Sequence, residues 1–516
     1  MKKIPCFIMV YLVVFLLTAC NTEGTNGIFY AITQEVESTR SNLDVKLTAK
    51  GMIESDQYLF LIANGLHAAF KDGRLIDEKK WLPLNSFENV VSAGKSHPFL
   101  ETETASSNCK DAVLCETDGT NILIASQSID DDYNSFESPN NPEYNKDFRI
   151  NRIFRLQQTD SNNPTKWKWK EIPVTYPSMK HSYDKVFRQM EVERIFVVNG
   201  EVYFLFNEKF IRKKYYITDE NGNQTANTEQ AVKSPYFTLY RVSGLLSGSP
   251  TFTEITMPSE EDHISSVLNL FSFVREGKTE TWFTTGRNLY SISGNRAEQV
   301  DIYVSAGIGN SGYYLNSKIE TITAVYCAAP SPYLTEDQKT LIHNGISYQI
   351  NNDKTVFMAV TYINKDYDRV NRLFRYTKSV SESIGSGNSA LVFDWNWSEC
   401  HLEGQTNDSL IVYTISDYYA EYTDTDGKKK YINKLVVGTN DGYLEAVPAN
   451  TIPSFITINY DDPQSTSASN LSTLILESAS VIGFFCADRG TSNGKLFAFT
   501  ASNGVWVNNR KIWSRE

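Results

Sequence analysis

Residues 195–206 read IFVVNGEVYFLF, and this stretch decides the fold class. Two runs of β-branched and aromatic residues lie on either side of the pair Asn199-Gly200. Asn-Gly favours the positive φ angles that a two-residue hairpin turn requires. The stretch therefore predicts two antiparallel strands joined by a tight turn.

The same signal recurs along the chain. Short apolar and aromatic runs alternate with turn pairs, and no segment after the N-terminus shows convincing helical periodicity. Further turn pairs are Asn64-Gly65, Asp72-Gly73, Asp118-Gly119, Asn344-Gly345, Asp426-Gly427, Asp441-Gly442, Asn493-Gly494 and Asn503-Gly504. The pattern predicts an all-β protein.

Four stretches share a degenerate repeat, in which an apolar strand, a Gly-containing turn and an aromatic strand follow one another. They span residues 59–81, 281–292, 435–444 and 494–513. These units resemble the blades of a β-propeller, because one small sheet cannot bury both of its faces alone. We expect one propeller of seven or eight blades, and tandem β-sandwich domains are the alternative.

Residues 494–506 are similar to the blade motif of quinoprotein-type propellers, in which a Gly, an aromatic-Ala-hydrophobic run and a later Gly and Trp recur. This resemblance implies the architecture and no quinone chemistry. Four polar segments, residues 126–147, 218–233, 379–389 and 461–472, are interpreted as loop insertions. No Pro-rich or Gly/Ser-rich linker divides the chain, which favours a single body.

The first 20 residues have the features of a targeting signal. Lys2 and Lys3 precede an apolar run over residues 7–17, and Leu17-Thr18-Ala19-Cys20 closes it. A transmembrane anchor is the alternative, but the run is shorter than the roughly 20 residues that a spanning helix needs. The order is that of a secretory signal.

The last four residues of this segment resemble a bacterial lipobox, which implies cleavage before Cys20 and its lipidation. The expected organisation is a signal peptide over residues 1–19, a lipidated cysteine with a short tether over 20–27, and a β-propeller-like body over 28–516. Asn21 stands where some Gram-negative lineages read Asp as an inner-membrane retention signal. The resemblance therefore favours the outer membrane and leaves the periplasmic or surface face open.

The balance of charge narrows the partners. The chain has 49 basic and 61 acidic residues and a formal net charge of −12. This balance argues against nucleic acid. Trp167 and Trp169 alternate with Lys166, Lys168 and Lys170, and we interpret them as the inner face of a half-buried strand whose lysines point outward.

Five cysteines remain after Cys6 and Cys20. Cys109 and Cys115 bracket a short polar segment, and we consider a disulfide between them that would staple a loop. Cys327, Cys400 and Cys486 lie in apolar runs and are interpreted as small buried hydrophobic residues. No CxxC pair is present, so a zinc ribbon is not expected.

Three sequence motifs resemble functional sites, but each is better interpreted as an ordinary loop, turn or strand. Residues 307–312 match GxGxxG, but β-like sequence follows where a dinucleotide site needs a helix. The acidic segments 130–132, 219–223 and 424–427 do not complete an EF-hand and are interpreted as solvated turns. Asp394 and Glu399 lie beside Trp395 and Trp397, and strand alternation explains these tryptophans better than a glycosidase cleft.

No catalytic residue, metal ligand or cofactor site is therefore predicted. The six histidines form no HExxH motif, and the chain has no GxSxG elbow. We expect a membrane-anchored, non-catalytic binding or assembly scaffold with an envelope protein or a glycan as partner. The resemblance to lipoprotein propellers that scaffold outer-membrane protein assembly points the same way, and a glycan-binding or glycan-cleaving envelope protein is the alternative.

Overall fold

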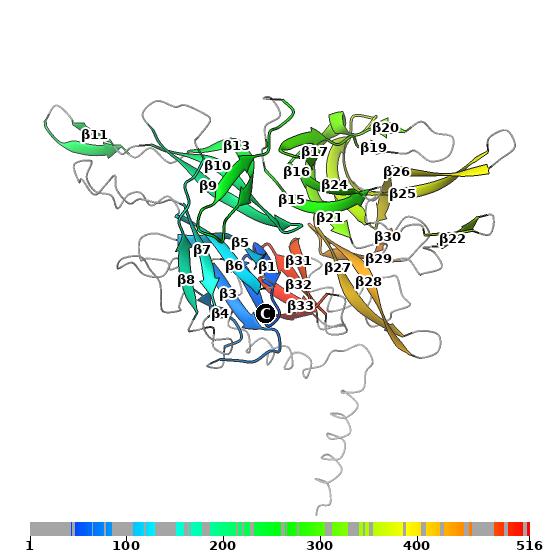
Figure 1. The fold of residues 1–516 in the computed structure, drawn as a ribbon, viewed down its shortest axis with the longest axis horizontal. Coiled ribbons are helices and arrows are strands. Elements are labelled where there is room, and N and C mark those ends of the chain that lie inside the picture. Colours follow the sequence, from blue (N-terminus) through cyan, green and yellow to red (C-terminus); the bar gives the residue numbers. More distant parts are fainter. Residues whose placement is uncertain are drawn as a thin grey trace, which may run out of the picture.

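The protein is a seven-bladed β-propeller in the computed structural model. Seven small sheets form a ring, and no α-helix occurs in the part of the chain that is described. Figure 1 shows the sheets following one another around the ring in sequence order, with the first sheet (blue) beside the last (red). The prediction of an all-β propeller is confirmed.

The structure describes the following residues: 43, 47–63, 65–76, 79–84, 107–117, 120–129, 151–158, 164, 167–177, 186–212, 215–218, 221–227, 232–259, 264, 266–275, 278–304, 312–328, 340–343, 346–349, 354–384, 389–403, 409–423, 428–447, 454–456, 479–489, 494–508 and 513–516. The signal segment, Cys20 and the tether lie outside these residues.

Each blade contains four antiparallel strands. Blade 1 has β1 (Gly51–Glu54), β2 (Tyr58–Ala63), β3 (Gly65–Phe70) and β4 (Leu82–Pro83). Blade 2 has β5 (Ser107–Thr117), β6 (Thr120–Ile129), β7 (Asn151–Gln157) and β8 (Lys168–Ile172). Blade 3 has β9 (Val186–Val198), β10 (Glu201–Arg212), β13 (Val232–Ser243) and β14 (Thr251–Glu254), with the side hairpin β11 (Tyr215–Thr218) and β12 (Gln224–Asn227).

The remaining blades follow the same plan. Blade 4 has β15 (Asn269–Arg275), β16 (Lys278–Thr284), β17 (Leu289–Ser293) and β18 (Arg296–Gln299). Blade 5 has β21 (Ile319–Ala328), β24 (Thr355–Ile363), β25 (Arg369–Ile384) and β26 (Ser389–Leu402). Blade 6 has β27 (Val412–Thr423), β28 (Lys429–Thr439), β29 (Tyr443–Val447) and β30 (Ser454–Ile456), and blade 7 has β31 (Val481–Ala487), β32 (Lys495–Thr500), β33 (Val505–Asn508) and β34 (Trp513–Arg515).

Three short elements lie between blades 4 and 5: β19 (Tyr303–Val304), β20 (Tyr313–Tyr314) and the 3₁₀-helix η5 (Asn316–Lys318). A further hairpin, β22 (Thr340–His343) and β23 (Ile346–Gln349), lies between β21 and β24. The first strands of the blades contact one another in sequence order, and β31 contacts β1. These contacts make the ring continuous.

Seven hydrophobic clusters hold the blades together, and each cluster joins two neighbouring blades. Tyr58 and Phe60 of blade 1, for example, pack against Trp167 of blade 2. Each sheet is thus buried on both faces by its neighbours, as a propeller requires. Tandem β-sandwiches, which pair their sheets two by two, are excluded.

Among the described residues, the first and last blades exchange no strand. Glu516, which follows β34, is 4% exposed, and it accepts a hydrogen bond of 3.0 Å from the Trp81 indole N–H. Lys80 Nζ lies 2.5 Å from the same carboxylate. Lys71, which follows β3, forms a second link by pairing with both Glu54 and Asp488. The Asp488 amide also donates a hydrogen bond of 2.9 Å to Glu54, so these contacts join blade 7 to blade 1.

The hairpin over residues 195–206 forms as the sequence predicts. Val198 pairs with Glu201, and the turn residues Asn199 and Gly200 have φ angles of 52° and 76°. The four repeat units lie in blades 1, 4, 6 and 7. Blades 2, 3 and 5 have longer or interrupted strands that hide the repeat.

Two blades extend into projecting ribbons. Beyond Tyr376, β25 pairs with β26 alone, up to the pair Ile384 and Ser389. In blade 6, β27 and β28 pair as far as Thr423 and Lys429, whereas β29 pairs only with the last part of β28. Figure 1 shows both ribbons reaching away from the ring. Residues 379–384 and 389, expected in a loop insertion, are therefore strand.

Candidate functional site

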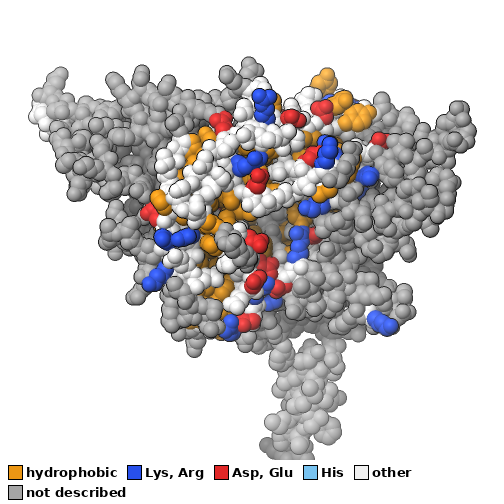
Figure 2. Space-filling view, in the orientation of Figure 1, with side chains coloured by type: hydrophobic (Ala, Val, Ile, Leu, Met, Phe, Trp, Pro, Cys, Tyr) orange, Lys and Arg blue, Asp and Glu red, His pale blue; other side chains and the backbone are white. Residues whose placement is uncertain are grey.

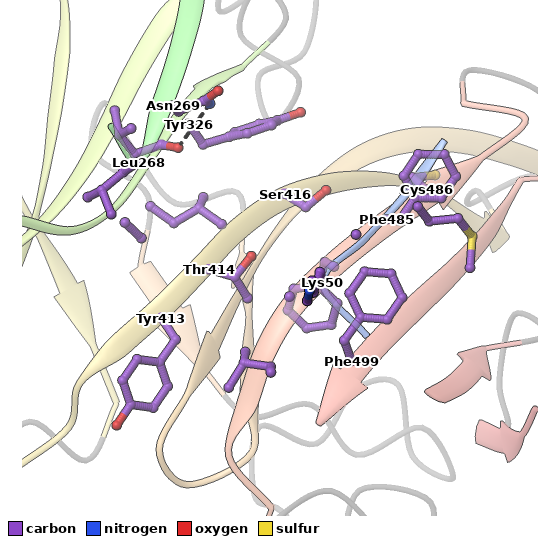
Figure 3. Close-up of a pocket in the computed structure, with 18 of the residues that line it drawn as sticks. Lys50, Leu268, Asn269, Tyr326, Tyr413, Thr414, Ser416, Phe485, Cys486 and Phe499 are labelled. Atoms are coloured by element: carbon purple, nitrogen blue, oxygen red, sulfur yellow. Dashed lines mark hydrogen bonds between the residues drawn. The ribbon is translucent and has the colours of Figure 1, made fainter. Parts of the chain in front are cut away.

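The candidate site is a central channel, the cavity of about 460 Å³ that the first strands of the blades surround. Residues of six blades line this cavity; among them are Lys50, which precedes β1, Arg194 of β9 and Asn269 of β15. Figure 3 shows Leu268, Asn269 and Tyr326 on one side of the view and Phe485, Phe499 and Lys50 on the other. The lining combines polar backbone and hydroxyl groups with aromatic rings.

Of the described residues that line the central channel, the charged ones are all cations: Lys50, Arg194 and Arg489. This is notable in a chain of net charge −12. Arg194 donates to the carbonyl oxygens of Val267 and Leu268, at 3.4 and 3.0 Å. Lys50 is exposed, and its ammonium group has no salt bridge to a described residue.

Asp111 of β5 does not line the cavity, but it contacts Arg194, which does. Its Oδ2 accepts a hydrogen bond of 2.8 Å from the Ile195 amide and lies 3.7 Å from Arg194 Nε. Burial raises the pKa of Asp111, while Arg194, the bonded amides and Lys50 oppose that rise. The carboxylate is held as a structural link between blades 2 and 3.

Asp417 of β27 forms a second buried link. Its side chain is fully buried, contacts the Arg489 guanidinium, and accepts a hydrogen bond of 2.8 Å from the Tyr326 hydroxyl. The guanidinium also lies over the Tyr326 ring. Burial raises the pKa of Asp417 to about 7. Arg489 thus connects blade 7 to blades 5 and 6 at the wall of the channel.

The two buried carboxylates do not make a catalytic pair. Asp111 lies on blade 2 and Asp417 on blade 6, each contacts its own arginine, and neither lines the cavity. Most glycoside hydrolases use two carboxyl groups that flank the bond to be cleaved, and Asp111 and Asp417 are not placed in this way. The described lining of the central channel offers cations, hydroxyl groups and aromatic rings to a ligand.

The second pair of carboxylates that the sequence suggested, Asp394 and Glu399, does not form a site in a cleft either. Asp394 and Glu399 are both exposed on β26, and Glu399 pairs with Arg372 at 3.0 Å. Trp395 and Trp397 belong to the cluster between blades 4 and 5, and both contact Tyr376. Strand alternation thus explains these tryptophans, as expected.

The other motifs are placed as follows. Trp167 and Trp169 are buried, whereas Lys168 and Lys170 are exposed. Gly312 leads into strand β20, so no helix follows the GxGxxG match, whose residues 307–311 lie outside the description. Asn221, Gly222 and Asn223 form an exposed turn, while the acidic segments 130–132 and 424–426 lie outside the described residues. Among the residues that are described, no three His, Cys, Asp or Glu side chains are placed to share a metal ion.

The structure contradicts the disulfide between Cys109 and Cys115. Both thiols are free, and both residues belong to one strand, β5. Six residues of extended chain span roughly 20 Å, whereas the Cα atoms of a disulfide lie about 4.4–6.8 Å apart. Cys109 packs between blades 1 and 2, and Cys115 packs between blades 2 and 3. The polar segment between them is strand rather than loop.

The other three cysteines lie in strands as expected. Cys400 and Cys486 are buried, and Cys327 is half-buried. Burial raises the pKa of both the Cys327 and Cys400 thiols to about 12.

Sequence reasoning did not identify the channel residues. Lys50, Arg194 and Arg489 come from blades 1, 3 and 7, far apart in the chain, and none belongs to a recognisable motif. Their convergence depends on closure of the ring. Only a charged residue at the start of an inner strand, such as Lys50, offered a local signal.

The sequence matches no protein-family model and no curated protein. Among solved structures, the extracellular domains 1–2 of Drosophila Semaphorin 1b are similar, with a TM-score of 0.28 and 10% identity over 79% of this chain and 86% of that one. An ancestral GH74 enzyme is similar with a TM-score of 0.22 and 11% identity over 90% of this chain, which covers 57% of the enzyme. Neither protein lends an activity to this chain.

No helix within the described part of the chain is long and apolar enough to cross a membrane.

Proposed function

We propose that this protein is a lipid-anchored envelope protein that works by binding rather than by catalysis. The observation that carries the proposal is the charge arrangement of the central channel. Its lining offers cations and aromatic rings, while the buried carboxylates Asp111 and Asp417 each contact an arginine. Such a site can hold a ligand, and the described residues that line it include no pair of carboxyl groups for acid–base chemistry.

The anchor in this proposal is Cys20. The sequence Leu17-Thr18-Ala19-Cys20 supplies the lipobox, and Asn21 favours the outer membrane. Replacement of Cys20 by Ala should move the protein from the membrane fraction to the soluble fraction, because the acyl chains supply the membrane affinity. Cell fractionation with immunoblotting measures this, and Cys486→Ala is the control. Membrane retention of Cys20→Ala would refute lipid anchoring.

The projecting ribbons support a role in assembly with a protein partner. The strands of blades 5 and 6 extend past their neighbours, and extensions of this kind can offer contact surface to a partner. The ribbon of β25 and β26 extends past the edge of blade 5, beyond the pairing with β24. In this extension the two strands pair only with each other and not with the rest of blade 5.

The test compares partners captured in the native envelope with and without this ribbon. Replacement of residues 381–392 by Asn-Gly keeps the pair Val380 and Phe393 next to the turn. In-cell crosslinking with mass spectrometry should recover a reproducible partner from the wild-type protein and lose it from the shortened protein. An identical set of crosslinked proteins from both would exclude the ribbon, and no reproducible partner from either would contradict the scaffold role.

One observation favours glycan binding as a second function. Tyr303 and Tyr314 of the β19–β20 hairpin are 42% and 59% exposed, with ring centroids 5.1 Å apart. Figure 2 shows a hydrophobic patch at its upper right, over the position of this hairpin. Exposed aromatic rings can stack on sugar faces. Glycan-array binding that Tyr314→Ala removes, without release of shortened glycans, would support capture; turnover would support a glycan-cleaving enzyme.

A further inference from the structure

The geometry points to a specific class of ligand for the central channel: a small organic anion whose charge contacts Lys50 Nζ and whose apolar part packs on the channel's aromatic rings. This inference rests on the proposed binding function and names the chemistry that the site selects.

Charge is the first argument. The described lining of the cavity contains three cations and no carboxylate. Arg194 is occupied by two carbonyl oxygens, and Arg489 by Asp417. Lys50 is different, since no described acid forms a salt bridge with it. The positive charge of Lys50 lowers the pKa of Asp111, but the oxygens of that carboxylate already accept backbone hydrogen bonds. Lys50 is therefore the cation left for a ligand.

The lining next to Lys50 is the second argument. Figure 3 shows the Phe499 ring beside Lys50, with Phe485 close by and the hydroxyl groups of Thr414 and Ser416 on the neighbouring strand. Aromatic walls favour an apolar body, and the hydroxyl groups can donate to oxygens. A free inorganic ion would leave these rings unused.

Size is the third argument. A cavity of about 460 Å³ lies within the range of roughly 300–1,000 Å³ that is common for small-molecule sites. It exceeds what one ordered water or one inorganic anion requires. A cation-lined cavity also concentrates anions from solution, even on a molecule of negative net charge.

The experiment uses the detergent-solubilised full-length protein and four probes of similar shape. Benzoate and phenyl phosphate carry a negative charge, benzamide is neutral, and benzylamine is positive. Isothermal titration calorimetry should show saturable binding of both anions, at least tenfold weaker binding of benzamide, and no binding of benzylamine. Equal affinity for benzamide and benzoate, or no binding of any anion, would overturn the inference.

Two variants assign the effect to Lys50. Lys50→Gln should weaken phenyl phosphate at least tenfold and leave benzamide unchanged, and Lys50→Glu should reverse the preference toward benzylamine. Lys278→Gln, an exposed lysine of β16, is the matched control and should bind like wild type. An unchanged phenyl phosphate affinity in Lys50→Gln would remove the site from this channel.

The test of anion binding can fail independently of the test of partner binding. Deletion of the β25–β26 ribbon should leave phenyl phosphate binding intact, and Lys50→Gln should leave the crosslinked partners unchanged. Loss of partner capture with retained anion binding would contradict only the scaffold role. The converse would contradict only the ligand assignment.

Discussion

Burial controls the protonation of the few ionisable side chains inside the propeller. The pKa of Asp417 rises to about 7 and that of His67 falls to about 4, because the interior disfavours the charged form of each group. His67 lies on β3, opposite Leu61 of β2 and Pro83 of β4, and its Nδ1 accepts no hydrogen bond from a described residue. It stays neutral in the folded protein at physiological pH.

His67 should make stability depend on pH. Its pKa is lower when folded than the ordinary 6.5, so the unfolded chain binds the proton more tightly. The folded protein should therefore lose up to about 3 kcal/mol from this group as the pH falls from 6.5 toward 4. Urea unfolding of wild type and His67→Gln at pH 7.0 and 4.5 measures it. The variant should lose less stability on acidification, and equal losses would contradict this assignment.

At the scale of elements, the hairpin turns depend on residues that adopt positive φ. Gly200 has a φ of 76°, with no atom within 4 Å of the position where a Cβ would stand. A side chain there would meet no steric neighbour, so any cost comes from the backbone conformation itself.

Gly200→Ala should therefore lower the free energy of unfolding by about 1–2 kcal/mol. Gly51→Ala is the matched control, since Gly51 also has open space around it but no positive φ. Its stability should stay within about 0.5 kcal/mol of wild type. Chemical denaturation of the three proteins measures the difference, and an equal effect of both substitutions would show that the turn conformation is not the cause.

At the scale of the whole molecule, the ring depends on contacts between its first and last blades. The cluster that joins them contains residues of both blades, such as Leu59 and Phe497. In the described part of the chain no strand crosses this boundary, and the polar links across it include the Glu516 carboxylate, the Lys71 ion pairs and the Asp488 amide bound to Glu54. This boundary is where we expect the ring to open first.

Glu516→Ala should destabilise the protein by about 2–4 kcal/mol, because it leaves the buried Trp81 indole N–H without its acceptor and Lys80 without its acid. Glu516→Gln keeps an acceptor and should lose less. Glu298→Ala, an exposed residue of β18, is the control. Hydrogen exchange should show faster exchange in blades 1 and 7 of Glu516→Ala, and a loss spread evenly over all blades would contradict the closure role.

Local patterns were sufficient for the strands, the turns and the propeller. Alternation of apolar and polar residues has the period of a strand, so Trp167 and Trp169 were placed inward and Lys168 outward from sequence alone. The hairpin at Asn199-Gly200 follows from backbone geometry that these two residues share with few others. Patterns of this kind depend on a few neighbouring residues, so they can be recognised without knowledge of the tertiary structure.

The central channel was decided only by tertiary structure. Cys109 and Cys115 look like a staple in the sequence because their separation is short, but an extended strand carries them apart. Lys50, Arg194 and Arg489 look unrelated because more than a hundred residues separate each from the next, but closure of the ring brings their blades together. Sequence distance sets spatial distance only within one element; between elements, the packing of blade on blade sets it.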